Sequence, residues 1–231
     1  MLGTIVNSLV VILGSLIGVF LKKGINEKYQ NTLIDSISLA VVIIGIMGSI
    51  KSENLVLVIV SLAIGSLIGE KVDIEGKLNR LGKKAEERFG KGDSDFSKAF
   101  VNATLVFCVG AMAIVGSLEA GLTGNHQTLL AKSSLDGIFS TIFASALGIG
   151  TAFSALPILI YQGSITLLAS YLKDIMSPEI INEMSAVGGI LIIAIGLNLL
   201  KVKKIKVGNM LPAIFIPLIY FLITNFAGIA I

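Results

Sequence analysis

One run of 36 residues, 137–172, contains no Lys, Arg, Asp or Glu. As a single α-helix it would be about 54 Å long, at about 1.5 Å per residue. The hydrocarbon core of a bilayer is about 30 Å thick, so one crossing does not accommodate the run even when the helix is tilted. The run therefore predicts two crossings joined by a tight turn near Gly148–Gly150. A re-entrant hairpin that does not cross the membrane is the alternative.

Apolar runs also make up most of the remaining chain. Only 14% of the residues are charged, against about a quarter in soluble domains, and the mean hydropathy is +0.91. The runs are continuous rather than alternating, which favours membrane helices over membrane strands. We therefore predict an all-α membrane protein with a single polytopic domain over 1–231. At about 20 residues a crossing, the predicted bundle has eight spans, at 3–21, 33–50, 54–70, 98–118, 133–150, 152–172, 183–200 and 207–227.

The basic residues support this topology. All of the 18 Lys and Arg residues except Lys51, Lys132 and Lys173 fall in connections on one side of the predicted membrane. Basic residues concentrate on the cytoplasmic side. If 137–172 did not cross twice, the cluster at Lys201–Lys206 would move to the other side. We therefore expect both termini to be external, and we interpret the first apolar run as a retained span rather than a cleaved signal.

The longest hydrophilic stretch, 71–97, carries apolar residues at helical spacing. They are Ile74, Leu78, Leu81, Ala85 and Phe89, with charged residues between them. This spacing predicts an amphipathic connector that lies on the cytoplasmic surface. A regulatory or partner-binding helix is the alternative.

The pentapeptide GSLIG occurs twice, each time at the end of a predicted span. Small residues four positions apart let helix backbones approach closely in a membrane. We interpret Gly14, Gly18, Gly65 and Gly69 as helix-packing positions, either within one chain or between copies in a homo-oligomer.

A fainter self-similarity relates the two ends of the chain. Setting Leu21-Lys22 against Leu172-Lys173 also pairs Asn31 with Asn182 and Ile44-Gly45 with Ile195-Gly196. Spans one to three would then correspond to spans six to eight in the opposite orientation. Inverted repeats of this kind are a common construction of secondary transporters, with the site near mid-membrane. The GSLIG echo, which joins two parallel spans, is a competing repeat.

The chain offers little for enzyme chemistry. It has one His (His126) and one Cys (Cys108), with no spacing that would build a metal site or a nucleophile–His–acid set. It has no phosphate-binding loop, and a net charge of +3 is too small to indicate nucleic-acid binding. We expect no enzyme activity, no metal, no cofactor and no nucleic-acid partner.

Asp136 is the first candidate site residue, because an acid inside a membrane span can bind a cation or carry a proton. The alternative is an acid in the first turn of its span, satisfied by the helix N-terminus with Ser133 or Ser134 as the cap. Glu119 closes the preceding span and could share an external vestibule with Asp136. An ordinary interfacial acid is the alternative for Glu119.

Gln162 lies near the middle of the sixth span, beside Tyr161. An amide at this depth either bridges helices or meets a substrate. Ser140, a hydroxyl of the fifth span, completes the predicted site of Asp136, Gln162, Glu119, Tyr161 and Ser140. Asn7 raises the same question with less force, because it lies nearer a membrane face.

Several segments resemble one protein family across nearly the whole chain. They are GTIVN, LGSLIG, VDIEGKLNRLG, VGAMAIVGSLEAGLTG, KSSLDG, FASALGIGTAFSALPILIYQG and GILIIAIGLNLL. The family is the set of bacterial multi-pass membrane proteins catalogued as domain of unknown function 554. The resemblance implies a bacterial cytoplasmic (inner) membrane location and a function described only as transport. It assigns no site residues.

Taken together, the sequence predicts a small secondary transporter or ion-coupled permease. Its partners would be the lipid bilayer and an unidentified small molecule or ion. An ion channel, which would use the same polar spans, and a non-transporting membrane scaffold are the alternatives.

Overall fold

The computed structural model describes residues 1–22, 27–87, 96–108, 111–172 and 176–227. Within these ranges the secondary structure is helical, without strands, which confirms the predicted all-α class. The helices are α1 (Leu2–Lys22), α2 (Glu27–Ser49), α3 (Leu55–Val72), α4 (Ile74–Ala85), α5 (Phe96–Cys108), α6 (Ala111–Leu122), α7 (Gln127–Leu147), α8 (Gly150–Phe153), α9 (Ala155–Leu172), α10 (Pro178–Leu199), α11 (Val207–Met210), the 3₁₀ helix η2 (Leu211–Phe215) and α12 (Ile216–Ala227).

Five helical segments in the described part of the chain are long and apolar enough to cross a membrane. α5 and α6 together would make a sixth span, bent by 60° between its halves. α2 and α7 have 23 and 21 residues, which suffices for a crossing at about 1.5 Å per residue. Neither belongs to the apolar set, because the apolar part of α2 is the shorter segment Ile34–Ser49 and α7 carries more polar residues. By apolarity the structure thus supports five or six spans, and the count of eight stays a prediction.

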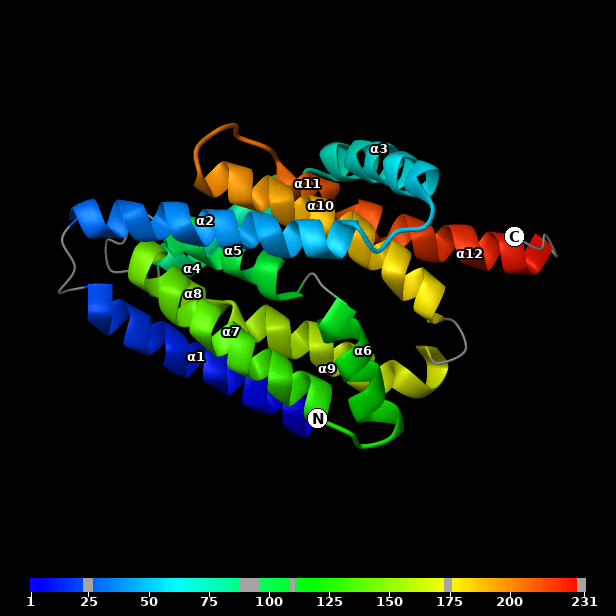
Figure 1. The fold of residues 1–231 in the computed structure, drawn as a ribbon, viewed down its shortest axis with the longest axis horizontal. Helices are drawn as coiled ribbons and strands as arrows, with labels where there is room; N and C mark the ends of the chain where they lie inside the picture. Colours follow the sequence, from blue (N-terminus) through cyan, green and yellow to red (C-terminus); the bar gives the residue numbers. More distant parts are fainter. Residues whose placement is uncertain (23–26, 88–95, 109–110, 173–175, 228–231) are drawn as a thin grey trace.

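The uncharged run forms two helical segments that run in opposite directions (Figure 1). α7 ends at Leu147, Gly148 takes a φ of 100°, and α8 begins at Gly150. A side chain at Gly150 would lie 2.1 Å from the carbonyl oxygen of Phe96. The chain therefore reverses at the predicted turn, where glycine supplies both a positive φ and a close backbone approach.

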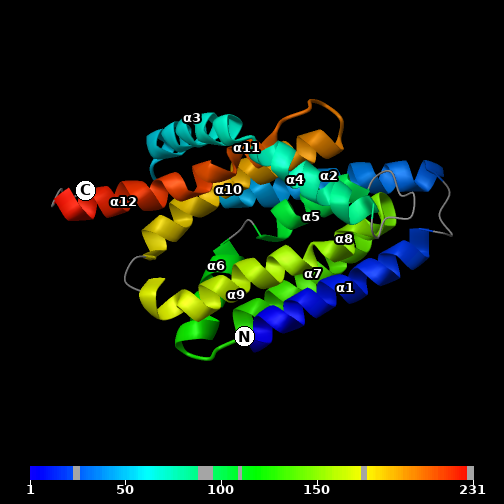
Figure 2. The same ribbon diagram turned by 180° about the vertical axis from the view of Figure 1, so that it is seen from behind.

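The bundle has two layers, with α5 between them (Figures 1 and 2). α1, α7 and α9 form one layer, and α2, α3, α10 and α12 form the other. The most extensive helix contacts are those of α1 along α7 and of α2 along α10.

Both GSLIG motifs lie at helix contacts within the chain. A Cβ atom on Gly18 would be 2.1 Å from the carbonyl oxygen of Thr141 in α7. A Cβ atom on Gly69 would be 1.9 Å from the carbonyl oxygen of Asn209 in α11. A Cβ atom on the first glycine of each motif would be 2.3 Å from Ser140 Oγ in α7 for Gly14, and 2.2 Å from Ala213 Cα in η2 for Gly65. These glycines let the backbones of α1 and α7, and of α3 and α11–η2, come together.

The predicted amphipathic connector, 71–97, contains the helix α4. α4 occupies its first half and packs on α5 and α11 (Figure 2), while Phe89 lies outside the described residues. The Glu75 backbone N–H donates to Asn209 Oδ1 at 2.7 Å, and the Gly208 N–H donates to Glu75 Oε2 at 3.0 Å. These bonds fix α4 to the start of the last span.

The outer faces of α1 and α3 are apolar. The exposed side chains there include Leu9, Leu13, Leu16 and Phe20 on α1, and Val56, Ile59 and Leu67 on α3. Contiguous exposed apolar surface on this scale is typical of helices that face lipid.

Candidate functional site

Four polar side chains from three helices meet inside the bundle. Asn7 Nδ2 of α1 donates to Asp136 Oδ2 of α7 at 3.0 Å and to Gln162 Oε1 of α9 at 3.4 Å. Lys132 Nζ, one turn before Asp136 on α7, forms an ion pair with the same Asp136 oxygen. Asn7 and Gln162 are 0% exposed, Lys132 7% and Asp136 6%. We call these four residues the polar cluster.

Close packing of α1 on α7 brings Asn7 to Asp136. Where Gly14 of α1 meets α7, a Cβ atom would lie 2.5 Å from the carbonyl oxygen of Gly137. The Ser140 hydroxyl donates to that same carbonyl oxygen at 2.9 Å. Ser140, a predicted site residue, thus lies in the α1–α7 contact and makes no hydrogen bond to the polar cluster among those the structure describes.

The polar cluster retains hydrogen-bonding capacity. A buried ion pair is tolerated when further hydrogen bonds offset the loss of water, and Asp136 has one such bond from Asn7. Asn7 Oδ1 and Gln162 Nε2, however, have no partner among the described residues. A buried amide group without a partner costs free energy, about 1–3 kcal/mol. The cluster can therefore accept and donate further hydrogen bonds to a ligand or to water.

A cavity of about 400 Å³ adjoins the ion pair, and we call it the ion-pair cavity. Lys132 and Asp136 form part of its wall, together with Lys51 just after α2. Most of the remaining wall is apolar, from Ile44, Met47, Val106, Phe107, Met112, Ala113, Leu135, Phe139 and Ile192. Its volume and its few polar groups on an apolar wall are typical of a small-molecule site.

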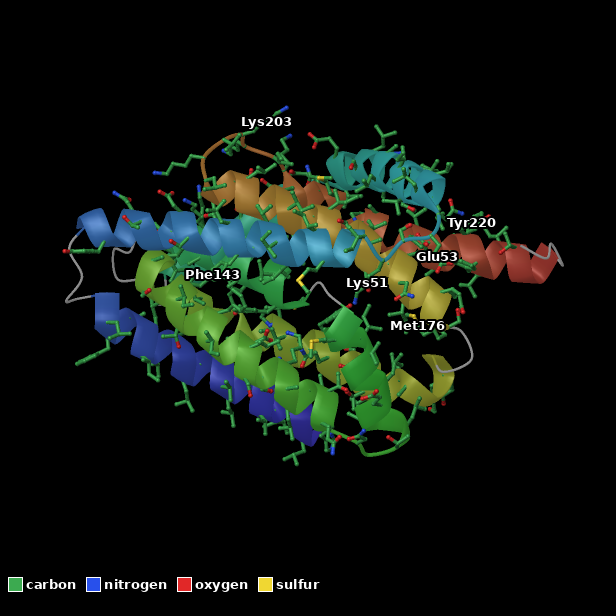
Figure 3. All side chains as sticks on the ribbon, in the orientation of Figure 1. Lys51, Glu53, Phe143, Met176, Lys203 and Tyr220 are labelled. Carbon is green, nitrogen blue, oxygen red and sulfur yellow. The ribbon has the colours of Figure 1, made fainter. Side chains whose placement is uncertain are left out.

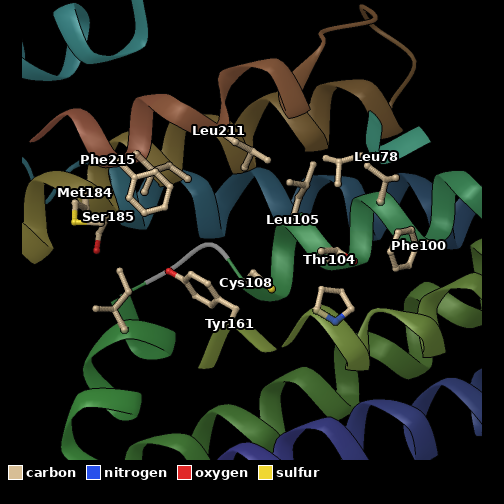
Figure 4. Close-up of a pocket in the computed structure, with 14 residues that line it drawn as sticks. Leu78, Phe100, Thr104, Leu105, Cys108, Tyr161, Met184, Ser185, Leu211 and Phe215 are labelled. Carbon is tan, nitrogen blue, oxygen red and sulfur yellow. The ribbon is translucent and has the colours of Figure 1, made fainter. Parts of the chain in front are cut away.

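Two other predicted residues lie elsewhere. Tyr161 immediately precedes Gln162 in sequence but lines a second cavity, of about 260 Å³ (Figure 4). Neighbouring residues of a helix point in different directions, so the two side chains diverge. Glu119 accepts a hydrogen bond from Thr128 Oγ1 at 2.7 Å, at the connection between α6 and α7. It is not among the residues that line the ion-pair cavity.

The interpretation of Asp136 as a first-turn acid is wrong. α7 begins at Gln127, so Asp136 lies more than two turns inside the helix. Ser133 and Ser134 donate to carbonyl oxygens one turn earlier in α7 and cap nothing. In the first turn of α7, Thr128 and Leu129 pack against Gly116 of α6.

Sequence reasoning gave Asn7 less weight and missed Lys132. It places Lys132 in an external connection, whereas the structure buries it inside α7. The spacing of Lys132 and Asp136, four residues apart on one helix, was an available signal for their pairing. No local signal identifies Asn7, because its partners lie on other helices.

A second buried acid, Glu183, serves a structural contact. Its carboxylate accepts hydrogen bonds from Ser52 Oγ at 2.7 Å and from the backbone N–H groups of Glu53 and Asn54 at 2.9 and 3.2 Å. Glu183 therefore ties α10 to the connection between α2 and α3. In the described ranges, no group of three His, Cys, Asp or Glu side chains could hold a metal ion.

Comparison with known proteins places the chain in a family. The family described as "Protein of unknown function (DUF554)" matches residues 2–222. The chain is 39% identical over 233 residues to "Uncharacterized membrane protein YdfK" of Bacillus subtilis (strain 168), covering 99% of each chain. It is 31% identical over 220 residues to "Uncharacterized protein YqgA" of Escherichia coli (strain K12), covering 93% of this chain and 94% of the other. No solved structure matches significantly. The chain therefore belongs to the DUF554 family of multi-pass helical membrane proteins.

Proposed function

We propose that the protein is a small secondary transporter or ion-coupled permease of the bacterial cytoplasmic membrane, and that the polar cluster is its substrate or ion site. One observation carries this proposal. A buried Lys132–Asp136 ion pair lies in the wall of a cavity of about 400 Å³, beside amide groups with unused hydrogen-bonding capacity. Ionisable residues inside membrane spans are costly, and they typically mark the path of a substrate or ion.

In this proposal the chain crosses the membrane eight times, with both termini outside. α2 and α7 are the two crossings that length and apolar composition do not identify. α7 can be more polar than the other spans because Lys132 and Asp136 are buried in the bundle, where Asp136 bonds to Asn7, and do not face lipid. With eight crossings, the basic residues keep the bias toward the cytoplasmic side that positive-inside topology requires.

Helix packing supports an inverted repeat of spans one to three and six to eight. Each of α1, α2 and α3 contacts its counterpart, namely α9, α10 and the segment α11–η2–α12. In the α2–α10 contact, a Cβ atom on Gly45 would meet the carbonyl oxygen of Gly189 and the side chain of Ile193. The alignment that pairs Leu21 with Leu172 also pairs Gly45 with Gly196, and Gly189 and Ile193 with two earlier residues of α2.

In this alignment Gly189 pairs with Ser38, and Ile193 pairs with Val42. A Cβ atom on Gly196 would meet these same two residues, Ser38 and Val42. The contact thus repeats itself when the two helices are exchanged. A local two-fold axis between α2 and α10 has this property. The bend between α5 and α6 and the reversal at Gly148 add the interrupted helices that such transporters use near their sites.

Asp136 is the residue of the polar cluster whose charge can change during transport. Its carboxylate holds Lys132 by charge and Asn7 by a hydrogen bond. Binding of a proton or another cation to Asp136 would leave the Lys132 charge without its partner. The net charge of the polar cluster therefore changes by one with the state of Asp136, which is the property that coupled transport requires.

The test starts from a thermal-shift screen of the purified protein against ions, amino acids and metabolites, because a ligand of the native state raises its apparent stability. The hit is then followed by flux into proteoliposomes for Asp136→Asn, Gln162→Leu and the control Glu119→Gln. We expect the two cluster variants to lose flux while folding normally, and the control to keep it. If both variants fold and leave every flux and ligand shift unchanged, the proposal is wrong.

The alternatives give different results in the same preparation. A voltage-driven current that does not saturate with solute would identify a channel instead. A scaffold would show no flux and a co-purifying protein that is lost when the apolar face of 73–90 is made polar.

A further inference from the structure

Three cavities of the bundle are neighbours that share lining residues. A cavity of about 650 Å³, which we call the lysine vestibule, lies between α4, α5 and the connection from α10 to α11. It shares Val101 and Leu105 with the cavity of about 260 Å³, which we call the middle cavity. The middle cavity shares Ser185 with the ion-pair cavity. The middle cavity therefore lies between the lysine vestibule and the cavity of the Lys132–Asp136 pair, with shared residues at each boundary.

The lysine vestibule is strongly basic. Five lysines line it, namely Lys83, Lys98, Lys201, Lys203 and Lys204. None of them forms an ion pair with a described residue. Two acids, Glu75 and Glu86, also line the vestibule, and the Glu75 carboxylate already accepts the Gly208 N–H. Because like charges in one hollow repel each other and attract anions, this end concentrates negative solutes.

The connection that carries three of these lysines has a defined shape. Asn198 Nδ2 donates to the Ile205 carbonyl oxygen at 2.8 Å, and the Ile205 N–H donates to Asn198 Oδ1 at 2.7 Å. Lys201 takes a left-handed φ of 58°. The amide of Asn198 thus fixes the base of the connection, so its lysines are held at the mouth of the vestibule.

The middle cavity is apolar. Among the described residues that line it, none is charged, and the polar ones are limited to Thr104, Cys108, Tyr161 and Ser185. Figure 4 shows Leu78 and Phe100 toward one end of this cavity and Met184 and Ser185 toward the other. A solute that passes here must bring apolar surface against these walls.

The ion-pair cavity again carries excess positive charge. Its lining includes Lys51, Lys132 and Asp136, two cations against one acid. Figure 3 shows Lys51 well apart from Lys203 of the vestibule. The positive-inside rule explains lysines on the cytoplasmic side but predicts few on the other side. Lys51, which the topology puts on that other side, and Lys132, buried within α7, nevertheless both line this one cavity.

We infer that the substrate is a small organic anion with an apolar body, such as an aromatic or aliphatic carboxylate or sulfonate. The inference rests on the proposed function and specifies its substrate class. The lysines of the vestibule and of the ion-pair cavity bind the acidic group of the substrate. Lys132 does so by exchanging its partner Asp136 for the substrate. The apolar walls of the cavities bind the rest of the molecule. A cation would meet more lysines than acids in both charged cavities.

The test uses matched aromatic probes on the purified full-length protein in detergent, with binding measured by calorimetry and thermal shift. Benzoate and benzenesulfonate carry the expected charge and body. Benzamide is neutral, benzylammonium is cationic, and formate has the charge without the body. We expect saturable binding of the two aromatic anions, and binding at least about tenfold weaker for the other three probes.

Variants locate the binding. Lys51→Gln, at an exposed position where folding is not at risk, should weaken benzoate binding roughly threefold, as expected for one solvent-screened charge. Lys132→Gln should weaken it at least about tenfold if it folds, since this lysine is buried. Lys77→Gln, on α4 and outside all three cavities, is the control and should bind as the wild type does.

The outcomes separate the inference from the proposed function. Saturable binding of benzylammonium that is lost in Asp136→Asn would keep the site and overturn the anionic class. Equal binding of formate and benzoate would overturn the apolar body. No binding of either aromatic anion at about 10 mM would reject the inference, and the flux of Asp136→Asn with the screened hit would then decide the proposed function by itself.

Discussion

Asn7 donates a hydrogen bond to Asp136 over 3.0 Å, although 129 positions separate the two residues in sequence. This bond joins the first helix to the helix that carries the buried ion pair. Both side chains are almost completely shielded from solvent. The contact therefore couples the packing of α1 on α7 to the charge state of the cluster.

The buried pair should show strong energetic coupling. Lys132→Met leaves the Asp136 carboxylate buried without its cation, and we expect a loss of about 3–5 kcal/mol. The double variant Lys132→Met/Asp136→Leu removes both charges and should recover most of that loss. Thermal unfolding of the wild type, both single variants and the double variant in one detergent measures the coupling. A double variant as unstable as the sum of the single variants would contradict it.

The close approach at Gly69 should not tolerate a methyl group. Gly69→Ala places a Cβ atom 1.9 Å from the Asn209 carbonyl oxygen, so α3 and α11 must separate. We expect a loss of about 1–3 kcal/mol, the usual cost of overpacking. Gly163→Ala is the matched control, because its nearest neighbour is the flexible Met1 Cε at 3.4 Å. The melting temperature should fall for Gly69→Ala and stay level for Gly163→Ala; similar values for both would refute the packing argument.

Hydrogen bonds to Glu183 should slow the exchange of the Glu53 and Asn54 backbone amides with solvent. Glu183→Ala removes the acceptor of the Glu53 N–H and one of the two acceptors of the Asn54 N–H, which also donates to Ser52 Oγ at 3.0 Å. Both amides should therefore exchange with deuterium faster, Glu53 more than Asn54. Unsatisfied donors at a partly buried site cost about 1–3 kcal/mol. Hydrogen–deuterium exchange with mass spectrometry of the 50–58 peptide measures the effect. Glu53→Ala, which changes an exposed side chain, is the control and should exchange as the wild type does.

The contact of α4 with α11 predicts a pH effect. Burial raises the pKa of the Glu75 carboxyl, and the hydrogen bond from Gly208 opposes this in part. A raised pKa in the folded state gives stability that is fully present below the unfolded pKa, about 4.3, and is lost as pH rises through the folded value. Glu75→Gln abolishes the titration but keeps an oxygen that can accept the Gly208 N–H.

The melting temperature of the wild type minus that of Glu75→Gln should therefore increase as the pH is lowered from about 8 to about 5. The difference is measured in one buffer series at constant ionic strength. A difference that is constant with pH, or that decreases on acidification, would show that Glu75 is not desolvated by this contact.

The proposed topology can be read with thiol labelling. In a Cys108→Ser background, which removes the chain's one cysteine, Lys203→Cys should be shielded from a membrane-impermeant maleimide in intact spheroplasts and labelled after lysis. Asn125→Cys, in the connection between α6 and α7, should be labelled in both preparations. The reverse pattern would place the termini inside, and equal labelling of both positions before lysis would reject the eight-span arrangement.

Local sequence determined that this is a helical membrane protein, and it determined where the chain reverses within its uncharged run. Charge depletion required membrane helices, and the length of 137–172 required a reversal, which occurs at Gly148. These features follow from the thickness of the bilayer and from backbone sterics, which act over short stretches of chain. The repeated GSLIG likewise indicates close helix contacts, because only small residues permit them.

The tertiary structure decided which polar residues meet. Asp136 and Gln162 come together through Asn7, whereas Tyr161 turns to another cavity and Glu119 bonds to Thr128. α7 starts at Gln127 and contacts α6, so Lys132 lies in the bundle and not in the predicted connection. Sequence periodicity fixes which face of a helix a residue occupies, but the partner of that face depends on how helices distant in sequence pack. A buried polar group must find its partner across that packing, which is why the site appears only in three dimensions.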